Sequence, residues 1–321
     1  MNLDTQPPVS QPLPSLPVLS LADDPAPFAQ AIGASFRQFG FAMVKDHGLD
    51  ADLIARAWQL TQAFFALPEA EKRRWAIPGI GGARGYTPFR TEIAKGALVS
   101  DLKEFWHIGR DLPEGHPLAG SMPPNVWPET PEGFRETFET LFAAFDDVGA
   151  TILSRIAVWL GLEAEWFVPA IADGNSVLRL LHYPPVPGAP DGAIRAGAHE
   201  DINLITLLLG AEEAGLELRT REGNWIEVSP PPGALVINIG DMLQRLTNHV
   251  LPSTTHRVRN PEGARAGFSR YSMPFFLHLR SDFPIETLPG CIGPDNPDLY
   301  PVPITADDYL QERLREIGLR M

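Results

Sequence analysis

Residues 199–209 read His-Glu-Asp-Ile-Asn-Leu-Ile-Thr-Leu-Leu-Leu, a polar triplet followed by a mainly apolar run. The run at 202–209 predicts a buried strand, because branched aliphatic side chains pack well on a pleated surface. Side chains two residues apart on a strand share one face, so His199 and Asp201 are expected to point inward while Glu200 points away. This pattern places an imidazole and a carboxylate side by side.

Short strand-like segments continue on both sides of this stretch. Turn residues separate them, including Pro184-Pro185, Gly223-Asn224 and the segment 230–233. Many short strands at close spacing are typical of a sandwich or barrel. The expected strands cover residues 177–183, 202–209, 216–219, 224–228, 234–239, 256–259 and 269–279.

The N-terminal half of the chain predicts helices. Apolar residues recur at helical spacing in residues 24–39, 52–66 and 131–160. A short strand is expected at 41–44, and residues 79–113 gather glycine and proline around aromatic residues, which indicates loops and short strands. Near the other end, Thr305 with two aspartates after it predicts the start of a last helix.

Composition and charge limit the partners that the chain can have. The 321 residues are 44% hydrophobic, enough for a substantial core, and carry a formal net charge of −14. No run of lysine or arginine suits a phosphate backbone, so neither nucleic acid nor an anionic membrane is an expected partner. No segment has the length of a membrane helix or the pattern of a signal peptide. The single cysteine, Cys291, is expected to be structural and favours a cytoplasmic location, and no obligate protein partner is evident.

A third metal ligand is expected on a later strand. Two histidines and one carboxylate form a facial triad that leaves coordination positions open, and these residue types suit Fe(II), Mn(II) or Zn(II). His256, in Ser253-Thr254-Thr255-His256-Arg257-Val258, is the leading candidate, because a neighbouring strand would bring it opposite the first pair. His249, earlier in the same region, is a rival ligand.

Positive charge for an anionic ligand is available on the strand expected at 269–279. Arg270 and Ser272 share a face there and offer a guanidinium and a hydroxyl to a carboxylate. In a strongly acidic chain, an anionic cosubstrate requires such a local cation. Tyr183 is a candidate phenol donor to the same ligand, whereas Arg265 lacks the R-x-S context and is the weaker arginine. Taken alone, such an arginine would pair with an acidic residue and such a tyrosine would pack in the core.

Several motifs occur in the order found in one enzyme family. They are Pro17-Val18-Leu19-Ser20-Leu21, Phe39-Gly40-Phe41, Asp46-His47-Gly48, Phe64-Phe65-Ala66-Leu67-Pro68, Tyr183-Pro184, His199-Glu200-Asp201 and Gly240-Asp241-Met242-Leu243-Gln244, with the distal histidine and the R-x-S strand. In this combination the chain resembles the iron(II)- and 2-oxoglutarate-dependent oxygenases of the isopenicillin N synthase-like group over nearly its whole length. The family match at residues 253–258 favours His256 as the ligand and leaves His249 as a turn residue.

The resemblance implies an α+β fold with a double-stranded β-helix (jelly-roll) core, flanked by N-terminal helices and a C-terminal helix. One oxygenase domain would then span residues 1–321. It would consist of a flexible arm at 1–16, a mainly helical part at 17–176, the jelly-roll catalytic core at 177–280 and a C-terminal segment with a helix at 281–321.

The resemblance also implies the reaction and its cofactors. The catalytic metal ligands would be His199, Asp201 and His256, binding Fe(II). The cosubstrate 2-oxoglutarate would chelate the metal, with its distal carboxylate on the R-x-S pair and Tyr183. Oxygen would be the second cosubstrate, and oxidative decarboxylation would be coupled to hydroxylation or a related oxidation of a small organic substrate.

The substrate pocket and three other functions stay open at this level. Arg84, Tyr86, Phe105 and His107 either line the pocket or pack over the mouth of the barrel. An oxidase like isopenicillin N synthase would not use 2-oxoglutarate. A non-catalytic barrel would bind a small acid or a metal without turnover, and a zinc hydrolase would use the same triad with a metal-bound water as nucleophile.

Overall fold

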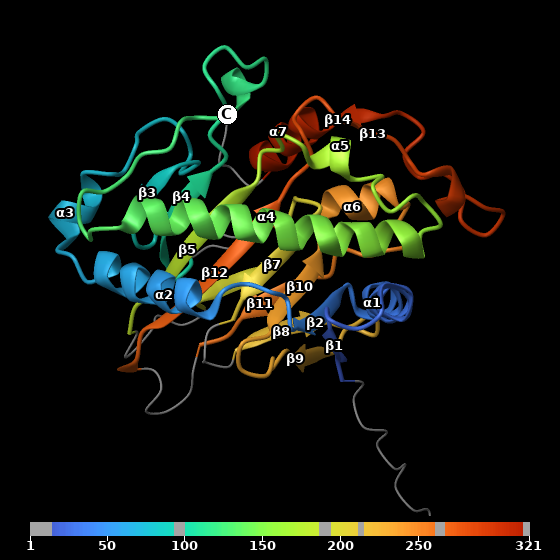
Figure 1. The fold of residues 1–321 in the computed structure, drawn as a ribbon, viewed down its shortest axis with the longest axis horizontal. Coiled ribbons are helices and arrows are strands. Elements are labelled where there is room, and N and C mark those ends of the chain that lie inside the picture. The colour runs from blue at the N-terminus through green and yellow to red at the C-terminus, as the bar shows by residue number, and fades with distance from the viewer. Residues whose placement is uncertain (1–14, 93–99, 186–193, 211–214, 261–266, 317–321) are drawn as a thin grey trace, which may run out of the picture.

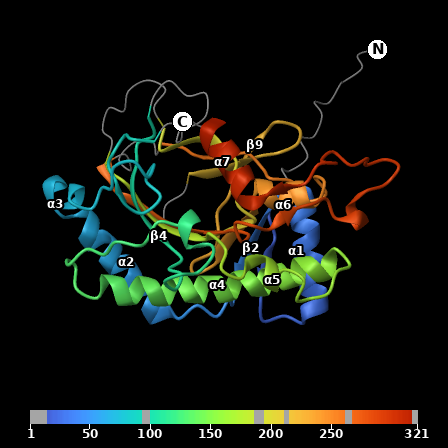
Figure 2. The same ribbon diagram turned by 90° about the horizontal axis from the view of Figure 1, so that it is seen from above.

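Two β-sheets packed face to face form the centre of the computed structural model, with helices against one of them (Figure 1). The structure describes residues 15–92, 100–185, 194–210, 215–260 and 267–316. Three helices, α1 (Pro25–Phe39), α2 (Ala51–Phe65) and α4 (Phe134–Trp159), lie together on one side, while α7 (Ala306–Glu316) lies on the other (Figure 2). The α+β class expected from the sequence is confirmed.

The larger sheet joins strands from both halves of the chain. Its order is β1-β2-β10-β7-β12-β5-β4-β3, and all neighbours are antiparallel except the parallel pair β1 and β2. The strands are β1 (Val18–Ser20), β2 (Phe41–Lys45), β3 (Gly85–Thr87), β4 (Glu104–Gly109), β5 (Val177–Tyr183), β7 (Ile205–Leu209), β10 (Leu235–Ile239) and β12 (Arg270–Leu277).

The smaller sheet is antiparallel and has the order β6-β11-β8-β9. Its strands are β6 (Ala196–His199), β8 (Leu216–Arg219), β9 (Trp225–Glu227) and β11 (His256–Val258). A separate two-stranded pair, β13 (Pro284–Ile285) and β14 (Ile304–Thr305), precedes α7. Two facing sheets built from interleaved segments of the chain form the expected jelly roll.

Short helices complete the described part of the fold. They are α3 (Glu69–Arg73), α5 (Val168–Ile171) and α6 (Asp241–Leu246), with 3-10 turns at Ala119–Ser121 and Pro289–Cys291. None of these was expected, because one or two turns give no usable hydrophobic period. In the described ranges no helix combines the length and the apolar character that a bilayer crossing requires.

Strand alternation gives the larger sheet two different faces. On β12, Met273, Phe275 and Leu277 belong to the main hydrophobic core beneath α4, whereas Arg270 and Ser272 alternate with them and point the other way. That second face meets the smaller sheet across its own apolar cluster. The polar side chains considered below therefore lie between the two sheets.

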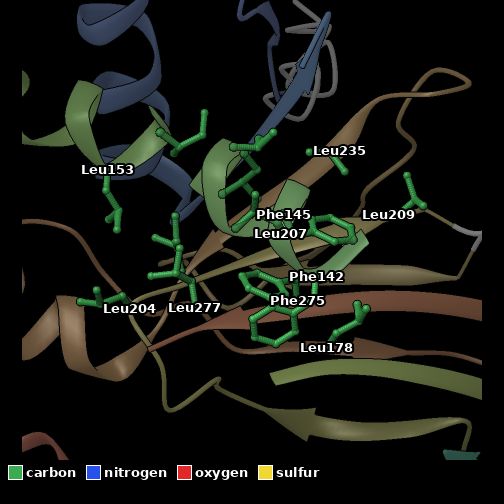
Figure 3. Packing of buried hydrophobic residues seen from close by; sticks show 14 of the residues in the cluster. Phe142, Phe145, Leu153, Leu178, Leu204, Leu207, Leu209, Leu235, Phe275 and Leu277 are labelled. Atoms are coloured by element: carbon green, nitrogen blue, oxygen red, sulfur yellow. The ribbon is translucent and has the colours of Figure 1, made fainter. Parts of the chain in front are cut away.

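Phe275 is at the centre of the contact between the sheet and α4 (Figure 3). Its ring stacks on Phe145 with centroids 5.4 Å apart and an interplanar angle of 4°, and it meets the edge of Phe142 at 5.0 Å. Both partners belong to the buried face of α4, whose apolar residues at helical spacing predicted this helix. The stacked rings therefore fix the helix layer against the strand that carries Arg270.

Replacement of Phe275 by alanine is expected to lower the free energy of unfolding by about 3–5 kcal/mol, because the lost ring leaves a cavity in a close-packed core. Chemical denaturation measures the change. Phe268→Ala is the matched control, since that ring is 60% exposed, and its effect should stay within about 0.5 kcal/mol. Equal losses in the two variants would contradict this packing.

The long helices and most strands confirm the sequence predictions. The expected last helix begins at Ala306, where the Asp308 backbone N–H donates to Thr305 Oγ1 at 3.1 Å and Thr305 Oγ1 donates to the Asp308 carboxylate at 2.7 Å. The strand expected at 202–209 is shorter at its start, because β7 begins at Ile205 and residues 202–204 form a bend, and the strand expected at 269–279 is observed as Arg270–Leu277. Strand β6 was not expected. Most of the proposed N-terminal arm, residues 1–14, lies outside the described residues.

Candidate metal and cosubstrate site

His199 and His256 are direct cross-strand partners in the smaller sheet. His199 is the last residue of β6 and His256 the first of β11, and their ring centroids are 4.4 Å apart. Asp201 Oδ1 lies 3.8 Å from Nε2 of His199 and 3.9 Å from Nε2 of His256. One candidate ligand atom from each residue lies within 4.8 Å of the others. The structure brings together the three residues selected from the sequence.

The reason for their proximity differs from the expectation. Asp201 lies beyond the end of β6, so strand alternation does not align it with His199. Its position is fixed instead by its backbone oxygen, which accepts the Asp241 N–H at 2.7 Å, and by hydrogen bonds to its carboxylate. Glu200 is exposed and accepts from Thr255 Oγ1 at 2.5 Å, which keeps it out of the triad.

The hydrogen bonds around the triad leave one atom of each residue available for a metal. Nδ1 of His199 lies 2.7 Å from the Gly197 carbonyl and Nδ1 of His256 lies 3.0 Å from the Thr254 carbonyl, so each Nδ1 carries the proton and each Nε2 has a free lone pair. Asp201 Oδ2 accepts from the side chains of Thr206 and Asn238, at 2.5 and 2.8 Å. Oδ1 is left to face the imidazoles.

Electrostatics keep the triad in the ionisation state that binds a cation. Burial and the neighbouring His256 lower the pKa of His199 to about 4, so its imidazole is neutral at pH 7. Burial alone would raise the pKa of Asp201, but the two imidazoles and the hydrogen bonds to Oδ2 lower it below its usual value. Two imidazoles and one ionised carboxylate fit a divalent metal of the iron(II) type.

Thr206 orients Asp201, and its loss is expected to weaken the site. Thr206→Val keeps the shape of the side chain and removes the donor to Oδ2, so the affinity for Fe(II) should fall by about 10- to 100-fold. Thr61→Val is the control, because Thr61 is equally buried and its hydroxyl has no hydrogen-bond partner in the described structure. Anaerobic iron titration of both variants measures the difference, and equal affinities would exclude this role.

Of the two alternative residues, His249 and Arg265, the structure describes only His249. His249 lies in a turn with a φ of 64°, and its Nε2 is 2.6 Å from the hydroxyl of Tyr300, remote from the triad. The interpretation of His249 as a turn residue is confirmed. Arg265 lies outside the described residues.

Arg270, Ser272 and Tyr183 form a buried group on the inner face of the larger sheet. Arg270 is in register with Tyr183 on β5, and its guanidinium carbon lies 5.1 Å from the centre of the tyrosine ring. All three side chains are buried. Lys103 is a further buried cation near Tyr183; its own burial is compensated by Glu92 at 2.6 Å and Asp101 at 2.8 Å, which hold its pKa above the usual value.

A cavity of about 420 Å³ opens beside the triad. His199 and Asp201 form part of its wall, and Arg84, Phe105 and His107 line it as well. From α7, Leu310, Gln311, Arg313 and Leu314 contribute to the wall. Arg270, Ser272 and Tyr183 are buried and are not among the residues that line this cavity. The volume is in the range of pockets that enclose small organic molecules.

Tyr86 does not line the cavity, which corrects one of the candidate substrate residues. Its side chain is buried, and its hydroxyl donates to Glu104 and, at 3.0 Å, to Glu69. Its ring packs against Phe64 in the main core. On β3 it is in register with Trp106, a residue of the main core on β4, whereas Phe105 and His107 on either side of Trp106 point to the opposite face and line the cavity.

Several functional positions were missed from the sequence. Lys103 immediately precedes β4 and lies two residues before Phe105, so extension of the strand by one residue places it on the same face as Phe105 and His107. No sequence pattern identifies Thr206 and Asn238 as functional residues. Each is a polar residue in an apolar strand, and its role becomes clear only from its hydrogen bond to Asp201. Arg179 and His278 also line the cavity.

Comparisons with known proteins identify the family. Residues 16–130 match the profile of the non-haem dioxygenase N-terminal region, described from morphine synthesis, and residues 174–279 match that of the 2OG-Fe(II) oxygenase superfamily. The 2-oxoglutarate-Fe(II) type oxidoreductase hxnY of Emericella nidulans is 33% identical over 296 residues, covering 89% of this chain and 83% of hxnY.

Two solved structures are similar over almost their full length. A 2OG-Fe(II) oxygenase family protein from Caulobacter crescentus has a TM-score of 0.89 and 54% identity, covering 94% of this chain and 99% of that chain. A full-length protein of Neurospora crassa, solved in complex with alpha-KG, has a TM-score of 0.82 and 29% identity, covering 94% of this chain and 96% of that chain.

The chain belongs to the 2OG-Fe(II) oxygenase superfamily. Within it, the protein is an iron(II)- and 2-oxoglutarate-dependent dioxygenase that couples oxidative decarboxylation of 2-oxoglutarate to the oxidation of a small organic substrate by O2. The function expected from the sequence is confirmed. It is favoured over the three alternative functions, which were a non-catalytic barrel, a zinc hydrolase and an oxidase that does not use 2-oxoglutarate.

Proposed function

We propose that His199, Asp201 and His256 bind the catalytic iron(II). The observation that carries this assignment is the cross-strand pairing of the two histidines with both Nε2 atoms directed at Asp201 Oδ1. Three protein ligands leave further coordination positions for a chelating cosubstrate and for oxygen. The carbonyl acceptors at Nδ1 and the donors at Oδ2 keep these three side chains oriented.

We further propose that Arg270, Ser272 and Tyr183 bind the distal carboxylate of 2-oxoglutarate. A guanidinium buried between the sheets provides a strong site for a carboxylate, because water does not screen the pair. The hydroxyls of Ser272 and Tyr183 supply neutral donors from two neighbouring strands. Together they would fix the position and orientation of 2-oxoglutarate relative to the metal.

The iron and 2-oxoglutarate, when bound, supply the oxidising chemistry, with succinate and carbon dioxide as products. The chain's own residues bind, orient and shield the reactants. Phe105 and Phe276 provide apolar wall beside the triad, and α7 covers part of the cavity. Arg84 and His107 are proposed substrate residues at the same cavity. Exclusion of water protects the oxidised substrate from side reactions.

The organisation and location of the enzyme are also proposals. The mainly helical part at 17–176 and the core at 177–280 would act as one oxygenase unit, because strands from both parts alternate in the larger sheet. A buried free Cys291 and the absence of basic runs support a cytoplasmic enzyme of small molecules without a nucleic-acid or obligate protein partner.

An anaerobic titration with Fe(II) and 2-oxoglutarate tests the residue assignments. A visible charge-transfer band should form in the wild-type protein and disappear in His199→Ala. Succinate release should depend on both additions. A band of unchanged strength in His199→Ala would reject this ligand assignment, and a wild-type protein that binds neither iron nor 2-oxoglutarate would reject the proposed site as a whole.

A further inference from the structure

Arg84 is a buried cation in the wall of the cavity, and two of its three guanidinium nitrogens make no hydrogen bond to the described residues. The side chain is 1% exposed, and Nη1 donates to the Ala83 carbonyl at 2.7 Å. Nε and Nη2 have no hydrogen-bond partner among the described residues. These two nitrogens lie on the same edge of the guanidinium, the edge that binds a carboxylate through two parallel hydrogen bonds.

The fold provides a specific place for this group at the end of β4. A Cβ atom added to Gly109 would lie 1.9 Å from Cζ and Nη2 of Arg84 and 2.3 Å from Nε. The guanidinium therefore rests directly on the backbone of Gly109, in space that any other residue would occupy. The Gly109 N–H and carbonyl are both bound by the side chain of Asn125, at 2.8 Å, which holds this surface in position.

The strand register separates Arg84 from the proposed 2-oxoglutarate residues. Gly109 is in register with Val177 on β5, and Val177 is in register with Phe276 on β12. Arg270 is at the opposite end of β12, six residues from Phe276, which is roughly 20 Å of extended strand. Arg84 is therefore spatially separate from the residues proposed to bind the distal carboxylate of 2-oxoglutarate.

Arg84 also differs from the other cations of the cavity wall. Lys103 pairs with Glu92 and Asp101, Arg179 lies 3.5 Å from Glu92, and Arg313 lies 3.1 Å from Asp241. No carboxylate in the described structure forms an ion pair with Arg84. Burial lowers its pKa to about 10, and the more distant Asp111 offsets only part of that effect, so the group is a desolvated cation at pH 7.

The neighbouring titratable groups leave this positive charge uncompensated. His107 and His278 both line the cavity and are within electrostatic reach of Arg84. Burial lowers the pKa of His107 well below its usual value and that of His278 to about 4, so both rings are neutral at pH 7. His278 is also within reach of Asp201, which connects the surroundings of Arg84 with the metal site.

We infer that the primary substrate is a small organic acid whose carboxylate binds side-on to Nε and Nη2 of Arg84, with its oxidised carbon toward the triad. The inference rests on the proposed function, because it takes the cavity beside His199 and Asp201 as the substrate site. An incoming carboxylate fills both unused donors and compensates the buried charge. A cavity of about 420 Å³ accommodates an acid of this kind together with an apolar body against Phe105 and Phe276.

Matched acids and amides test the inference on the full chain. Calorimetry with 3-phenylpropionate, cyclohexanecarboxylate and benzoate, each against its carboxamide, should show that at least one acid binds about 10-fold or more tightly than its amide. Arg84→Met should reduce this preference to within about 2-fold, and Arg84→Lys should retain part of it, because lysine keeps the charge without the fork. Arg110→Met is the matched control, since Arg110 adjoins Gly109, pairs with Asp146 and is outside the cavity wall.

The outcomes separate this inference from the proposed function. No preference for any acid, or a preference unchanged in Arg84→Met, would overturn the carboxylate site. The iron and 2-oxoglutarate band should form at the same 2-oxoglutarate concentration in Arg84→Met as in the wild type, which also shows that the variant is folded. Loss of that band with unchanged thermal stability would assign Arg84 to 2-oxoglutarate and reject the inference. If the wild type prefers acids but forms no band, the proposed metal site fails while the carboxylate site stands.

Discussion

Replacement of His256 by alanine is expected to weaken iron(II) binding by more than about 100-fold, which exceeds the typical effect of losing an outer hydrogen-bond partner of a ligand. Two remaining ligands cannot hold the ion in a facial arrangement. Succinate release should fall with iron occupancy. Anaerobic titration of the charge-transfer band measures affinity, and succinate release at saturating 2-oxoglutarate measures turnover.

His249→Ala is the matched control for this experiment. Its imidazole stacks on Tyr300 at a turn, so its loss should leave iron binding unchanged. The opposite result, in which His249→Ala loses iron binding and His256→Ala keeps it, would show that His249 is the third metal ligand. A third outcome, with iron kept in both variants, would require a ligand from a part of the chain that the structure does not describe.

Replacement of Arg270 by methionine is expected to raise the concentration of 2-oxoglutarate for half-maximal turnover by roughly 100-fold, because removal of one partner from a buried charge pair costs several kcal/mol. Iron binding without cosubstrate should be unchanged, since Arg270 lies on the larger sheet and both histidines on the smaller one. Measurement of succinate release against 2-oxoglutarate concentration gives the shift.

Arg257→Met provides the comparison for Arg270. Arg257 follows His256 directly, but its guanidinium pairs with Glu217 at 2.7 Å and stacks over Trp225 at 4.0 Å. Its loss should change the half-maximal 2-oxoglutarate concentration by less than about 3-fold, as expected for a partly exposed pair. Similar shifts in the two variants would show that general charge, and not a specific carboxylate contact, controls binding of the cosubstrate.

Much of the fold was predictable because its signals are periodic. The apolar stripe of α4 repeats at about 3.6 residues, the strand at Val177–Tyr183 is a mainly apolar run that ends before Pro184-Pro185, and both elements occur where the pattern places them. The triad was also accessible, since its residue types are distinctive and the motif order is specific. What the pattern could not give was the reason for the geometry at Asp201, which depends on a bend and on partners from β7 and β10.

The substrate residues show the limit of local sequence. Arg84 and Tyr86 are separated by a single residue, yet one lines the cavity and the other packs in the core. Gly109 matters only because Arg84 rests on it, a relation between two strands' ends that no local pattern contains. Such assignments need the register of the sheet, which is set by pairings between distant segments.

The order of the larger sheet has a consequence for biosynthesis. Its first two and last two positions are occupied by β1 to β4, which are made early, whereas β10, β7, β12 and β5 fill the centre and are made later. On the ribosome, β4 can pair with β5 and β2 with β10 before β12 is made, but the two halves of the sheet are joined only by β12, which ends at Leu277. Non-local pairing of this kind slows folding and exposes strand edges, so we expect overproduction at low temperature or with chaperones to increase the yield of native enzyme.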